Sequence, residues 1–399
     1  MSRPTIALVA AQAARVGRLV RLGHPWIYDR ALPASSAAFA PGAIAIVVDA
    51  DGAALGCAFV DPTSPLRARL LDRDPAASLD EAWVARRTEA AARRRALLPE
   101  LAVTDAVRAV HGENDGAPGL TVDVYAGVAV VVFDGEAAAA FWRPRVDAAL
   151  AGLRAGGIAI HARWIRAVRG APRGEPASGD GGPEVTIREH AAHFVVDVRA
   201  GQKTGFFLDQ RANRARVASL SARASVLNLC AYTGGFSVAC GLAGATAVTS
   251  VDLAPAAIAA ADAHWRRNQL PPGGHLGVVA DCFDFLQEAV AARRLWDVTI
   301  VDPPSFAASE AVKPRGLLAY QRLNRDAIAV TRRGGLLVSA SCSSHVTEAD
   351  LRGVLAAAAA EVRRGVRVIE ARGAAGDHPT LPGFPEGRYL KLLIAVVDA

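Results

Sequence analysis

The sequence predicts an α/β fold whose largest part is a mostly parallel sheet covered by helices. Beyond about residue 189, short apolar runs alternate regularly with helical patterns, and such alternation is typical of a parallel sheet with helices on both faces. Several of these runs end in a polar residue and a turn, as strands do where such sheets bind ligands. Up to about residue 70, short β-rich runs are instead separated by turn residues, which favours a small barrel-like module.

The 399 residues suffice for two or three domains. We expect an N-terminal domain over 1–70, a central α+β domain over 71–188 and a C-terminal domain over 189–399. The last boundary follows a stretch at 169–184 that is rich in glycine, proline and charge, a composition typical of surface loops and linkers.

The central domain combines a helical pattern with hairpins. Leu79–Leu98 has helical periodicity, with Glu89 and Arg93 four residues apart. Further on, alternating apolar residues are interrupted by an Asp-Gly dipeptide at 115–116 and by Ala-Gly at 126–127. These turn dipeptides predict strands on either side of them.

The C-terminal domain is expected to contain seven strands. Their apolar runs are Ser225–Leu229, Ala247–Val251, Leu276–Val279, Asp297–Val301, Leu336–Ala340, Arg367–Glu370 and Tyr389–Val397. The helices between them are expected after the glycines at 234–235 to about Ala243, from Pro255 to about Asn268, after Asp281 to Arg294, from about Tyr320 onward, and over Thr347–Arg364.

The composition is that of a soluble globular protein with a modest excess of positive charge. Apolar residues make up 52%, charged residues 21%, and the formal net charge is +6, which favours polyanionic partners. Lysine occurs only three times among 45 cationic residues, and an arginine bias of the gene explains the charge equally well. Arginines gather on the predicted helix Leu79–Leu98, where they either follow a phosphate backbone or form a solvated face: Arg86, Arg87, Arg93, Arg94 and Arg95.

The cysteines and apolar stretches indicate a cytoplasmic protein without a membrane span. The five cysteines are scattered and contain no CxxC pair: Cys57, Cys230, Cys240, Cys282 and Cys342. This pattern argues against a disulfide framework and against a structural zinc site, so we expect no metal. The first apolar run ends at Gln12, too early for a signal peptide, and the uncharged stretch 224–251 is interrupted by polar residues and glycines.

Four polar signals follow the first four strands of the predicted parallel sheet. A glycine-containing turn, Asn228-Leu-Cys-Ala-Tyr-Thr-Gly-Gly-Phe236, follows the first strand, and its glycines permit close backbone approach to a ligand. Asp252 ends the second strand, where a carboxylate accepts hydrogen bonds from ribose hydroxyls. Asp281 follows the third strand and suits an adenine amino group, and Asp302 begins an Asp-Pro-Pro-Ser-Phe sequence after the fourth.

Two cofactor classes fit a glycine turn with an acidic strand end. A nicotinamide dinucleotide is disfavoured because the G-x-G-x-x-G fingerprint is absent. Asp-Pro-Pro followed by an aromatic residue is instead typical of methyltransferases, where it presents carbonyl groups and a ring to a flat base. The four signals in order therefore favour a methyltransferase.

Several longer motifs resemble one family. They are LGHPWIYDRAL (22–32), GENDGAPGLTVDVY (112–125), GQKTGFFLDQRANR (201–214), LNLCAYTGGFSVA (227–239), VDPPSF (301–306), SASCSS (339–344) and DHPTLPGFPEGRYLK (377–391). The chain resembles the RlmI-type bacterial methyltransferases that make 5-methylcytosine in large-subunit ribosomal RNA. This resemblance covers nearly the whole chain.

The resemblance implies an N-terminal PUA domain, a central EEHEE-type α+β domain and a C-terminal Rossmann-like class I methyltransferase domain with a seven-stranded sheet. It implies S-adenosyl-L-methionine as cofactor, large-subunit ribosomal RNA as substrate and a homodimer as one possible assembly. The implied cofactor-binding residues are Gln202, Thr204, Phe206, Asp209, Gln210, Asn228, Tyr232, Gly234, Phe236, Asp252, Asp281 and Asp302. One departure is Ser305, where the family often has lysine, and it puts a phosphate or base contact at that position in doubt.

Cys342 and Asp302 are the predicted catalytic residues. Carbon 5 of cytosine becomes nucleophilic when a thiolate adds to carbon 6, so the reaction needs a thiol and a group that supports charge at the ring. Cys342 follows the fifth strand and Asp302 the fourth, and neighbouring strands lie roughly 5 Å apart. Thr347 and Asp350 form a capping-box pattern whose helix dipole favours the thiolate. His345 is one candidate for the proton acceptor, and a capping or solvated histidine is the alternative.

The N-terminal module mixes cations with aromatic residues over a short stretch: Arg18, Arg21, His24, Trp26 and Tyr28. Stacking combined with phosphate contact suits looped RNA. From spacing alone, Trp26 and Tyr28 are more typical of a core, and it is the PUA resemblance that favours an RNA platform.

Three alternatives remain open at this point. The same fold and cofactor also suit methylation of a purine nitrogen by the Asp-Pro-Pro-Ser-Phe motif, which requires no cysteine. An RNA-binding or assembly factor with an inactive methyltransferase fold is disfavoured by the intact Asp252, Asp281, Asp302 and Cys342. A nicotinamide oxidoreductase is disfavoured by the missing dinucleotide fingerprint.

Overall fold

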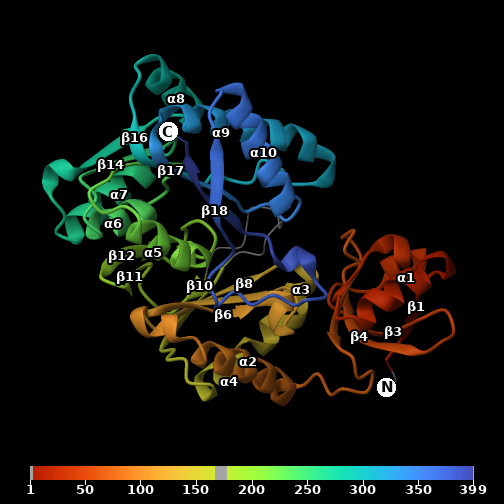
Figure 1. The fold of residues 1–399 in the computed structure, drawn as a ribbon. Coiled ribbons are helices and arrows are strands. Elements are labelled where there is room, and N and C mark those ends of the chain that lie inside the picture. Colours follow the sequence, from red (N-terminus) through yellow and green to blue (C-terminus); the bar gives the residue numbers. More distant parts are fainter. Residues whose placement is uncertain (1–2, 167–177, 399) are drawn as a thin grey trace. The chain divides into compact units, whose positions relative to one another are not determined.

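The computed structural model describes residues 3–166 and 178–398 of the chain, which is shown in Figure 1. It contains two compact units. The first comprises Met1–Ile187, Val196–Leu208 and Gly376–Gly387, and the second comprises Arg188–Val195, Asp209–Ala375 and Arg388–Ala399. Within the described ranges, none of the helices combines the length and the apolar character needed to cross a bilayer.

The N-terminal part of the first unit is a five-stranded sheet. Its strands are β1 (Thr5–Ala7), β2 (Trp26–Ile27), β3 (Ile44–Val48), β4 (Ala54–Val60) and β5 (Ala68–Asp72). The order is β1-β3-β4-β5-β2, with β1 parallel to β3 and the other neighbours antiparallel. The short β-rich runs expected up to about residue 70 form these strands, so the small β-rich module is confirmed.

A helix in this module was missed by the sequence analysis. α1 (Ala10–Arg21) buries Ala13, Val16, Gly17 and Val20, and its apolar side chains join the core of the five-stranded sheet. Positions 13, 16, 17 and 20 have the i, i+3, i+4, i+7 spacing of an amphipathic helix. This signal was available in the sequence, but the short apolar run before Gln12 obscured it.

The central part of the first unit is a second five-stranded sheet covered by helices. Its strands are β6 (Ala106–His111), β7 (Leu120–Tyr125), β8 (Val128–Phe133), β9 (Ala162–Ile165) and β10 (Ser178–Gly179), in the order β10-β9-β8-β7-β6. Its helices are α2 (Glu81–Ala96), α3 (Glu136–Trp142) and α4 (Val146–Ala155). The predicted hairpin at 126–127 joins β7 and β8, and both turn residues have positive φ. The α+β character of this part is therefore confirmed.

The predicted linker at 169–184 lies only partly in the described residues. Residues 169–177 fall outside them, whereas β10 begins at Ser178. β11 (Glu184–Glu189) and β12 (Ala192–Asp197) then form a two-stranded sheet.

Several arginines of α2 are held in ion pairs within the first unit, so the helix does not form a purely solvated face. Arg95 is only 3% exposed and donates to both carboxylate oxygens of Asp115, each at 2.7 Å. Arg94 binds Asp115 at 2.8 Å, and Arg87 binds Asp72 at 2.5 Å. Arg93 pairs with Glu89 along the helix surface, as its spacing predicts. Arg87, Arg94 and Arg95 therefore form ion pairs with other elements of the unit, which helical periodicity alone does not reveal.

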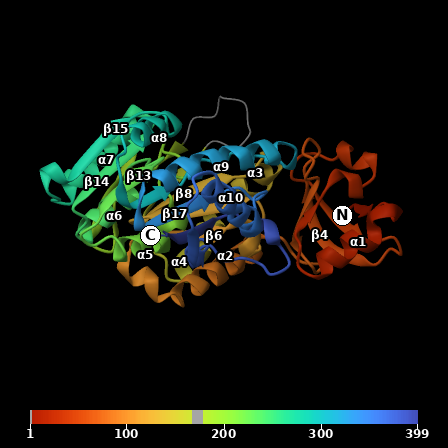
Figure 2. The ribbon, with the colours of Figure 1, turned by 45° about the horizontal axis from the view of Figure 1, so that its top comes forward.

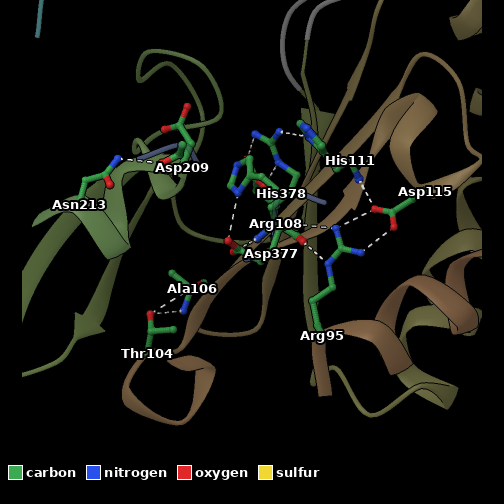
Figure 3. Close-up of polar contacts among 12 residues, drawn as sticks. Arg95, Thr104, Ala106, Arg108, His111, Asp115, Asp209, Asn213, Asp377 and His378 are labelled. Atoms are coloured by element: carbon green, nitrogen blue, oxygen red, sulfur yellow. Dashed lines mark hydrogen bonds and ion pairs between the residues drawn. The ribbon is translucent and has the colours of Figure 1, made fainter. Parts of the chain in front are cut away.

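A C-terminal segment belongs to the first unit and binds its central sheet (Figure 3). Asp377 accepts a hydrogen bond from the backbone N of Arg108 at 2.9 Å, and its other oxygen bonds His378 at 3.0 Å. Arg95 donates to the carbonyl of Asp377 at 2.8 Å. The side chains of Asp377 and His378 are almost fully buried. This segment, 376–387, is therefore anchored by buried polar contacts.

The second unit contains the predicted seven-stranded sheet. Its strands are β13 (Ser225–Leu229), β14 (Ala247–Asp252), β15 (His275–Val279), β16 (Trp296–Val301), β17 (Thr331–Ser341), β18 (Val366–Arg372) and β19 (Lys391–Val397). The order is β15-β14-β13-β16-β17-β19-β18, with β19 antiparallel to both of its neighbours and the other pairs parallel. The predicted α/β class and Rossmann-like sheet are confirmed.

Helices cover both faces of this sheet. They are α5 (Arg211–Ser219), α6 (Gly235–Leu242), α7 (Pro255–Arg267), α8 (Cys282–Ala291), α9 (Lys313–Val330) and α10 (Glu348–Glu361). The first three share one apolar cluster with the sheet, and the last three share another. Figure 2 shows α6 beside β14 and α9 beside β17. Neighbouring strand residues alternate between the clusters, as Val226 and Leu227 do.

One helix begins earlier than predicted. We expected a helix from about Tyr320, but α9 begins at Lys313. Pro314 stands in its first turn, where proline is well tolerated because the missing N–H has no intrahelical partner there. The proline therefore marks the start of the helix.

Candidate active site

The polar residues that follow the parallel strands lie at one edge of the sheet. Leu229 at the end of β13 pairs with Val251 of β14 on one side and with Val301 of β16 on the other. Asp252 and Asp302 therefore follow equivalent positions of the two flanking strands. Ligands of open α/β sheets bind beyond this edge, where the strand order reverses on either side of the first strand.

Asp252 is suited to a ribose. Its Oδ2 accepts a hydrogen bond from the backbone N of Tyr232 at 2.8 Å, and its Oδ1 accepts one from the backbone N of Ala254 at 3.0 Å. Each oxygen of an ionised carboxylate has two acceptor positions. The second position on each oxygen is thus available to the two hydroxyls of a ribose, and Asp252 is half-buried rather than enclosed.

The turn between β13 and α6 has an unusual backbone. Cys230 (φ 54°), Tyr232 (φ 47°) and Gly234 (φ 78°) all adopt the left-handed region. This region is costly for residues with a Cβ, and such strain is concentrated at functional sites. The strained turn points the backbone N–H of Tyr232 at Asp252 and so helps to fix that carboxylate.

Gly234 has a packing role that the sequence did not indicate. We expected the glycine to make room for a ligand, but a Cβ added there would lie 2.8 Å from the Cβ of Ala261 on α7. Gly234 therefore permits a close approach of the turn to α7, in addition to its positive φ. A contact between Gly234 and a cofactor stays a prediction.

Asn228 and Phe236 lie inside the unit. The amide of Asn228 donates to Ser237 Oγ at 2.9 Å, and Ser237 bonds Ser250 at 2.6 Å. Phe236 belongs to the apolar cluster beneath α5, α6 and α7. Both residues support the glycine turn from within, and their direct contact with a cofactor stays a prediction.

One carboxylate oxygen of Asp281 caps a helix, and the other is available to a ligand. Its Oδ1 accepts a hydrogen bond from the backbone N of Phe283 at 2.7 Å and so caps α8. Oδ2 has no protein partner among the described residues and suits an adenine amino group. The half-buried position of Asp281 leaves this oxygen accessible.

A chain of side-chain hydrogen bonds orients Asp302. Gln210 Nε2 donates to Asp302 Oδ2 at 2.9 Å, and Asn213 Nδ2 donates to Gln210 Oε1 at 2.6 Å. Arg372 Nε donates in turn to Asn213 Oδ1 at 2.9 Å. The structure gives Gln210 a role beside Asp302, and its contact with the cofactor stays a prediction. Asn213 and Arg372 were missed, because they are linked to Asp302 only through the fold.

Asp209 lies next to this chain and has a partner of its own. The hydroxyl of Tyr389 donates to Asp209 Oδ2 at 2.7 Å, and the carbonyl of Asp209 accepts from the backbone N of Ala375 at 2.8 Å. Asp209 is almost fully buried. A structural role is therefore visible, and a cofactor contact stays a prediction.

Gln202, Thr204 and Phe206 belong to the first unit. Thr204 bonds the hydroxyl of Tyr125 at 2.7 Å and also donates to Asp123, while the backbone N of Phe206 donates to Tyr125 at 3.2 Å. The structure thus anchors this loop to the central sheet through two buried residues that sequence reasoning missed. The roles of these three residues toward a cofactor stay predictions.

Cys342 lies on a loop that is tied to the loop of Asp302. Ser343 Oγ donates to the carbonyl of Ala307 at 2.6 Å, which connects the two loops directly. Ser341 Oγ donates to the hydroxyl of Tyr320 at 3.0 Å. Val301 pairs with Ser339, so strands continued in line place the Cα atoms of Asp302 and Cys342 about 8 Å apart.

The helix after Cys342 begins as predicted. Thr347 and Asp350 form a complete capping box at the start of α10, and Lys313 pairs with Asp350 at 2.9 Å. Burial raises the pKa of Asp350, but the hydrogen bonds from Lys313 and Thr347 outweigh it and lower that pKa to about 2. His345 pairs with the exposed Glu310 at 3.3 Å, and its role as proton acceptor stays a prediction.

The remaining cysteines differ from Cys342 in their surroundings. Cys57 and Cys240 are fully buried, and burial raises the pKa of both thiols, to about 11 for Cys240. Cys230 and Cys282 lie 3.5 Å apart at their sulfurs beneath the glycine turn. Their position supports the predicted packing role, whereas Cys342 is half-buried beyond a strand end.

The aromatic residues of the N-terminal module are engaged within the first unit. Trp26 Nε1 donates to Glu113 at 2.8 Å, and its ring meets Phe384 edge to face with centroids 4.6 Å apart. His24 is buried and pairs with Glu386 at 3.3 Å. Trp26 and His24 therefore connect segments of this unit, which fits the core-like alternative stated above. Arg18 is exposed.

The fold and the strand-end residues define a Rossmann-like enzyme that holds a nucleoside cofactor and carries a thiol and a carboxylate on adjacent loops. Residues 120–368 match the S-adenosylmethionine-dependent methyltransferase family, and residues 13–73 match the PUA-like domain. The chain therefore belongs to the S-adenosylmethionine-dependent methyltransferase family, with a PUA-like domain at its N-terminus. S-adenosylmethionine is its cofactor, and the paired acceptor positions of Asp252 fit the ribose of that molecule.

Relatives of known name cover the whole chain. It is 36% identical to a "Ribosomal RNA large subunit methyltransferase" of Deinococcus radiodurans, over 100% of this chain and 98% of the relative. It is 33% identical to "Ribosomal RNA large subunit methyltransferase I" of Cronobacter sakazakii, over 97% and 98%. A putative methyltransferase from Streptococcus mutans superposes with a TM-score of 0.84 at 21% identity, covering 99% of this chain and 100% of the other. A putative methyltransferase complexed with SAH gives 0.84 at 22%, covering all of both chains. These two likenesses concern the fold.

Proposed function

We propose that this methyltransferase forms 5-methylcytosine in large-subunit ribosomal RNA, with Cys342 as the covalent nucleophile. The RNA class is supported by the names of the relatives, which match the chain over nearly its full length. The chemistry is supported by one observation above all: the loop of Cys342 is bonded to the loop that follows Asp302. A purine-nitrogen methyltransferase would have no use for a thiol at this position.

The reaction proceeds by addition, transfer and elimination. The thiolate of Cys342 adds to carbon 6 of cytosine, and the electron pair of the 5,6 double bond becomes available at carbon 5. S-adenosylmethionine, when bound, supplies an electrophilic methyl group on a sulfonium. After carbon 5 has taken the methyl group, a base removes the carbon-5 proton. The released electron pair then re-forms the double bond and expels the thiolate.

Asp302 supports the ring while the thiolate adds. Negative charge develops on the ring side that includes nitrogen 3, and a carboxyl group carrying a proton there donates a hydrogen bond to that nitrogen. Gln210 fixes the rotation of the carboxyl group through Oδ2. The relay from Arg372 through Asn213 keeps Gln210 in place. Asp302 thus touches the base, whereas Gln210 positions Asp302.

The cofactor is held by the other strand ends. Asp252 binds the ribose hydroxyls, Asp281 binds the adenine amino group through Oδ2, and the backbone of the strained turn lies alongside. We include the loop residues Gln202, Thr204 and Phe206, together with Asp209, Asn228, Gly234 and Phe236, as further candidates. Replacement of each by alanine, followed by calorimetric titration with S-adenosylhomocysteine, separates those that contact the cofactor from those that only support the fold.

Four further expectations belong to this proposal. The domains are 1–70, 71–188 and 189–399, the enzyme acts in the cytoplasm, it contacts its RNA partly through the N-terminal domain, and it forms a homodimer. Light scattering coupled to gel filtration tests the dimer, since a mass near that of one chain at micromolar concentration contradicts it.

The function is tested by bisulfite sequencing of ribosomal RNA from cells with the gene, without it, and with Cys342→Ala. We expect one cytosine in the large-subunit RNA to resist conversion only with the wild-type gene. No cytosine changing between the strains contradicts the 5-methylcytosine assignment. If the cytosine still resists conversion with Cys342→Ala, the covalent mechanism is contradicted.

A further inference from the structure

The chain uses lysine at very few places. All but three of its 45 cationic residues are arginine, and the exceptions are Lys203, Lys313 and Lys391. Lysine offers a compact ammonium with three donors that can lose its proton, whereas arginine offers a planar fork that stays charged. In a chain that employs arginine for nearly every ion pair, a lysine indicates a place that a guanidinium does not suit. Lys313 and Lys391 both lie in the second unit.

Lys391 bonds the loop of Cys342 itself, and Lys313 bonds the helix that follows this loop. Lys313 begins α9 and pairs with Asp350, in the first turn of the helix that follows the loop. Lys391 begins β19, which pairs antiparallel with β17 so that Lys391 lies opposite Ser341. The pairing of the two strands thus fixes the position of Lys391 beside residue 342. This position does not depend on the conformation of a flexible surface side chain.

The ammonium of Lys391 is held in the interior. The residue is only 9% exposed. Its Nζ donates to the carbonyl of Ser343 and, at 2.8 Å, to the carbonyl of Tyr389. Ser343 follows Cys342 directly, so the first bond fixes the peptide that carries the thiol. Two carbonyls occupy two of the three N–H donors, and one donor remains for an anion.

The charges around Lys391 favour a partner in the loop. Burial lowers the pKa of Lys391 to about 8, while negative charge on Cys342 and Asp350 raises it and the charge of Lys313 lowers it. Electrostatic coupling is reciprocal, so an ammonium that a thiolate stabilises also stabilises that thiolate. Other titratable groups near the loop are Asp302, Tyr320, Asp350, Lys313 and the His345–Glu310 pair.

The start of α10 is a weaker source of positive potential than the sequence suggested. Its first turn carries the carboxylates of Glu348 and Asp350, and the backbone N of Asp350 is bonded by Thr347. Asp350 itself is paired with Lys313. The partial charge of the helix terminus is thus offset within the helix, and Lys391 is the full positive charge bonded to the loop of Cys342.

We propose that Lys391 is the positioning residue that maintains Cys342 as a thiolate, through its charge and through its bond to the Ser343 carbonyl. This inference rests on the proposed function, in which the thiolate attacks carbon 6. A point-like ammonium suits the two backbone carbonyls that Lys391 bonds and keeps a third donor, whereas a planar guanidinium requires acceptors in its own plane.

The test measures the thiol rather than methylation. The full-length protein is alkylated with iodoacetamide, a neutral reagent, between pH 6 and pH 10, and the Cys342 peptide is quantified by mass spectrometry. The variants are Lys391→Gln, which keeps an N–H donor but no charge, and Lys391→Met, which keeps neither. Arg352→Gln is the matched control, because it removes one charge from the exposed Arg352–Glu348 pair on α10.

We expect both Lys391 variants to alkylate Cys342 about tenfold more slowly at pH 7, with the half-maximal pH raised by about one unit. Their rates at pH 10, where Lys391 of the wild type has also lost its proton, should match the wild type, and Arg352→Gln should match it throughout. An unchanged profile in both Lys391 variants overturns the inference, as does an equal shift in Arg352→Gln. Equal rates at pH 10 also exclude misfolding as the cause.

Failure of the proposed function is recognised separately. If Cys342→Ala retains cytosine methylation, the covalent mechanism is wrong whatever the alkylation profiles show. If Cys342→Ala is inactive while the Lys391 variants alkylate like the wild type, the mechanism stands and Lys391 has no part in it.

Discussion

Replacement of Asp252 by asparagine tests the cofactor site at its best-defined point. The carboxylate accepts from two backbone N–H groups and keeps one acceptor position on each oxygen for the ribose. Asparagine replaces one oxygen by an amide nitrogen and removes the charge. A hydrogen bond to a charged group contributes about 1.5–3 kcal/mol. Loss of one such bond and weakening of the other should therefore raise the Kd of S-adenosylmethionine roughly 30- to 150-fold.

The same change carries a modest cost in stability. The new amide nitrogen faces either the N–H of Tyr232 or that of Ala254, so one of these donors loses its acceptor. We expect a loss of about 1 kcal/mol and a decrease in Tm of a few degrees. Asp284→Asn serves as the matched control, because Asp284 is an exposed carboxylate in the first turn of α8, and it should leave both quantities near their wild-type values.

The assay is isothermal titration of both variants and the wild type with S-adenosylhomocysteine and with its 2′-deoxy analogue. If Asp252 holds the ribose, the wild type binds the deoxy compound more weakly than S-adenosylhomocysteine. The Asp252→Asn protein should show a much smaller difference between the two ligands, as a double-mutant cycle requires for directly interacting groups. An Asp252→Asn protein that binds the cofactor within about threefold of the wild type refutes the assignment. Equal losses for the deoxy compound in both proteins refute it as well.

Three further outcomes follow from the described contacts. Asp115→Ala leaves the 3% exposed Arg95 without its carboxylate and should lower the free energy of unfolding by about 3–5 kcal/mol. Urea denaturation measures this free energy. A loss below about 1 kcal/mol contradicts a buried ion pair. The pKa of Asp350 is lowered to about 2, so its contribution is present above the ordinary carboxylate range and is lost as the pH falls toward 2. Asp350→Ala should therefore lower the free energy of unfolding by about 1 kcal/mol at neutral pH. The variant should also lose less stability than the wild type between pH 4 and pH 2. A stability difference from the wild type that does not depend on pH argues against the ion pair. Gln210→Ala should reduce kcat roughly tenfold with little change in cofactor affinity if Gln210 acts through Asp302; a large rise in the cofactor Kd with kcat unchanged places it on the cofactor instead.

The features that the sequence predicts well are those carried by local patterns. Strand ends such as Asp252 and Asp302 were recognised because an apolar run stops at a charged residue, and the capping box of Thr347 and Asp350 was recognised because its two residues are three apart. Both signals depend on a few neighbouring residues.

The features that the sequence predicts poorly are those that depend on residues brought together by the tertiary fold. Arg95 looks like any helix arginine until Asp115, on a different element, is placed beside it. Gly234 looks like part of a ligand-binding turn, although the space it leaves is filled by Ala261. Gln210 was placed on the cofactor because it belongs to a motif, whereas its bond to Asp302 spans 92 residues.

Lys391 shows the same limit most clearly. It lies 49 positions beyond Cys342 in the chain, and only the antiparallel register of β17 and β19 brings it opposite Ser341. A sequence pattern cannot specify that register without the pairing itself. The rarity of lysine was visible in the composition, but its meaning required the position of the ammonium.

Mechanism-based trapping tests the central claim most directly. A large-subunit RNA transcript containing 5-fluorocytidine is incubated with S-adenosylmethionine and the enzyme, and the products are separated on a denaturing gel. Fluorine at carbon 5 blocks the final elimination, so the wild type should remain covalently attached to the RNA through Cys342, while Cys342→Ala should form no such complex. If methyl transfer to unmodified RNA proceeds with no trapped complex, or if Cys342→Ala is trapped as well as the wild type, then covalent catalysis by Cys342 is contradicted.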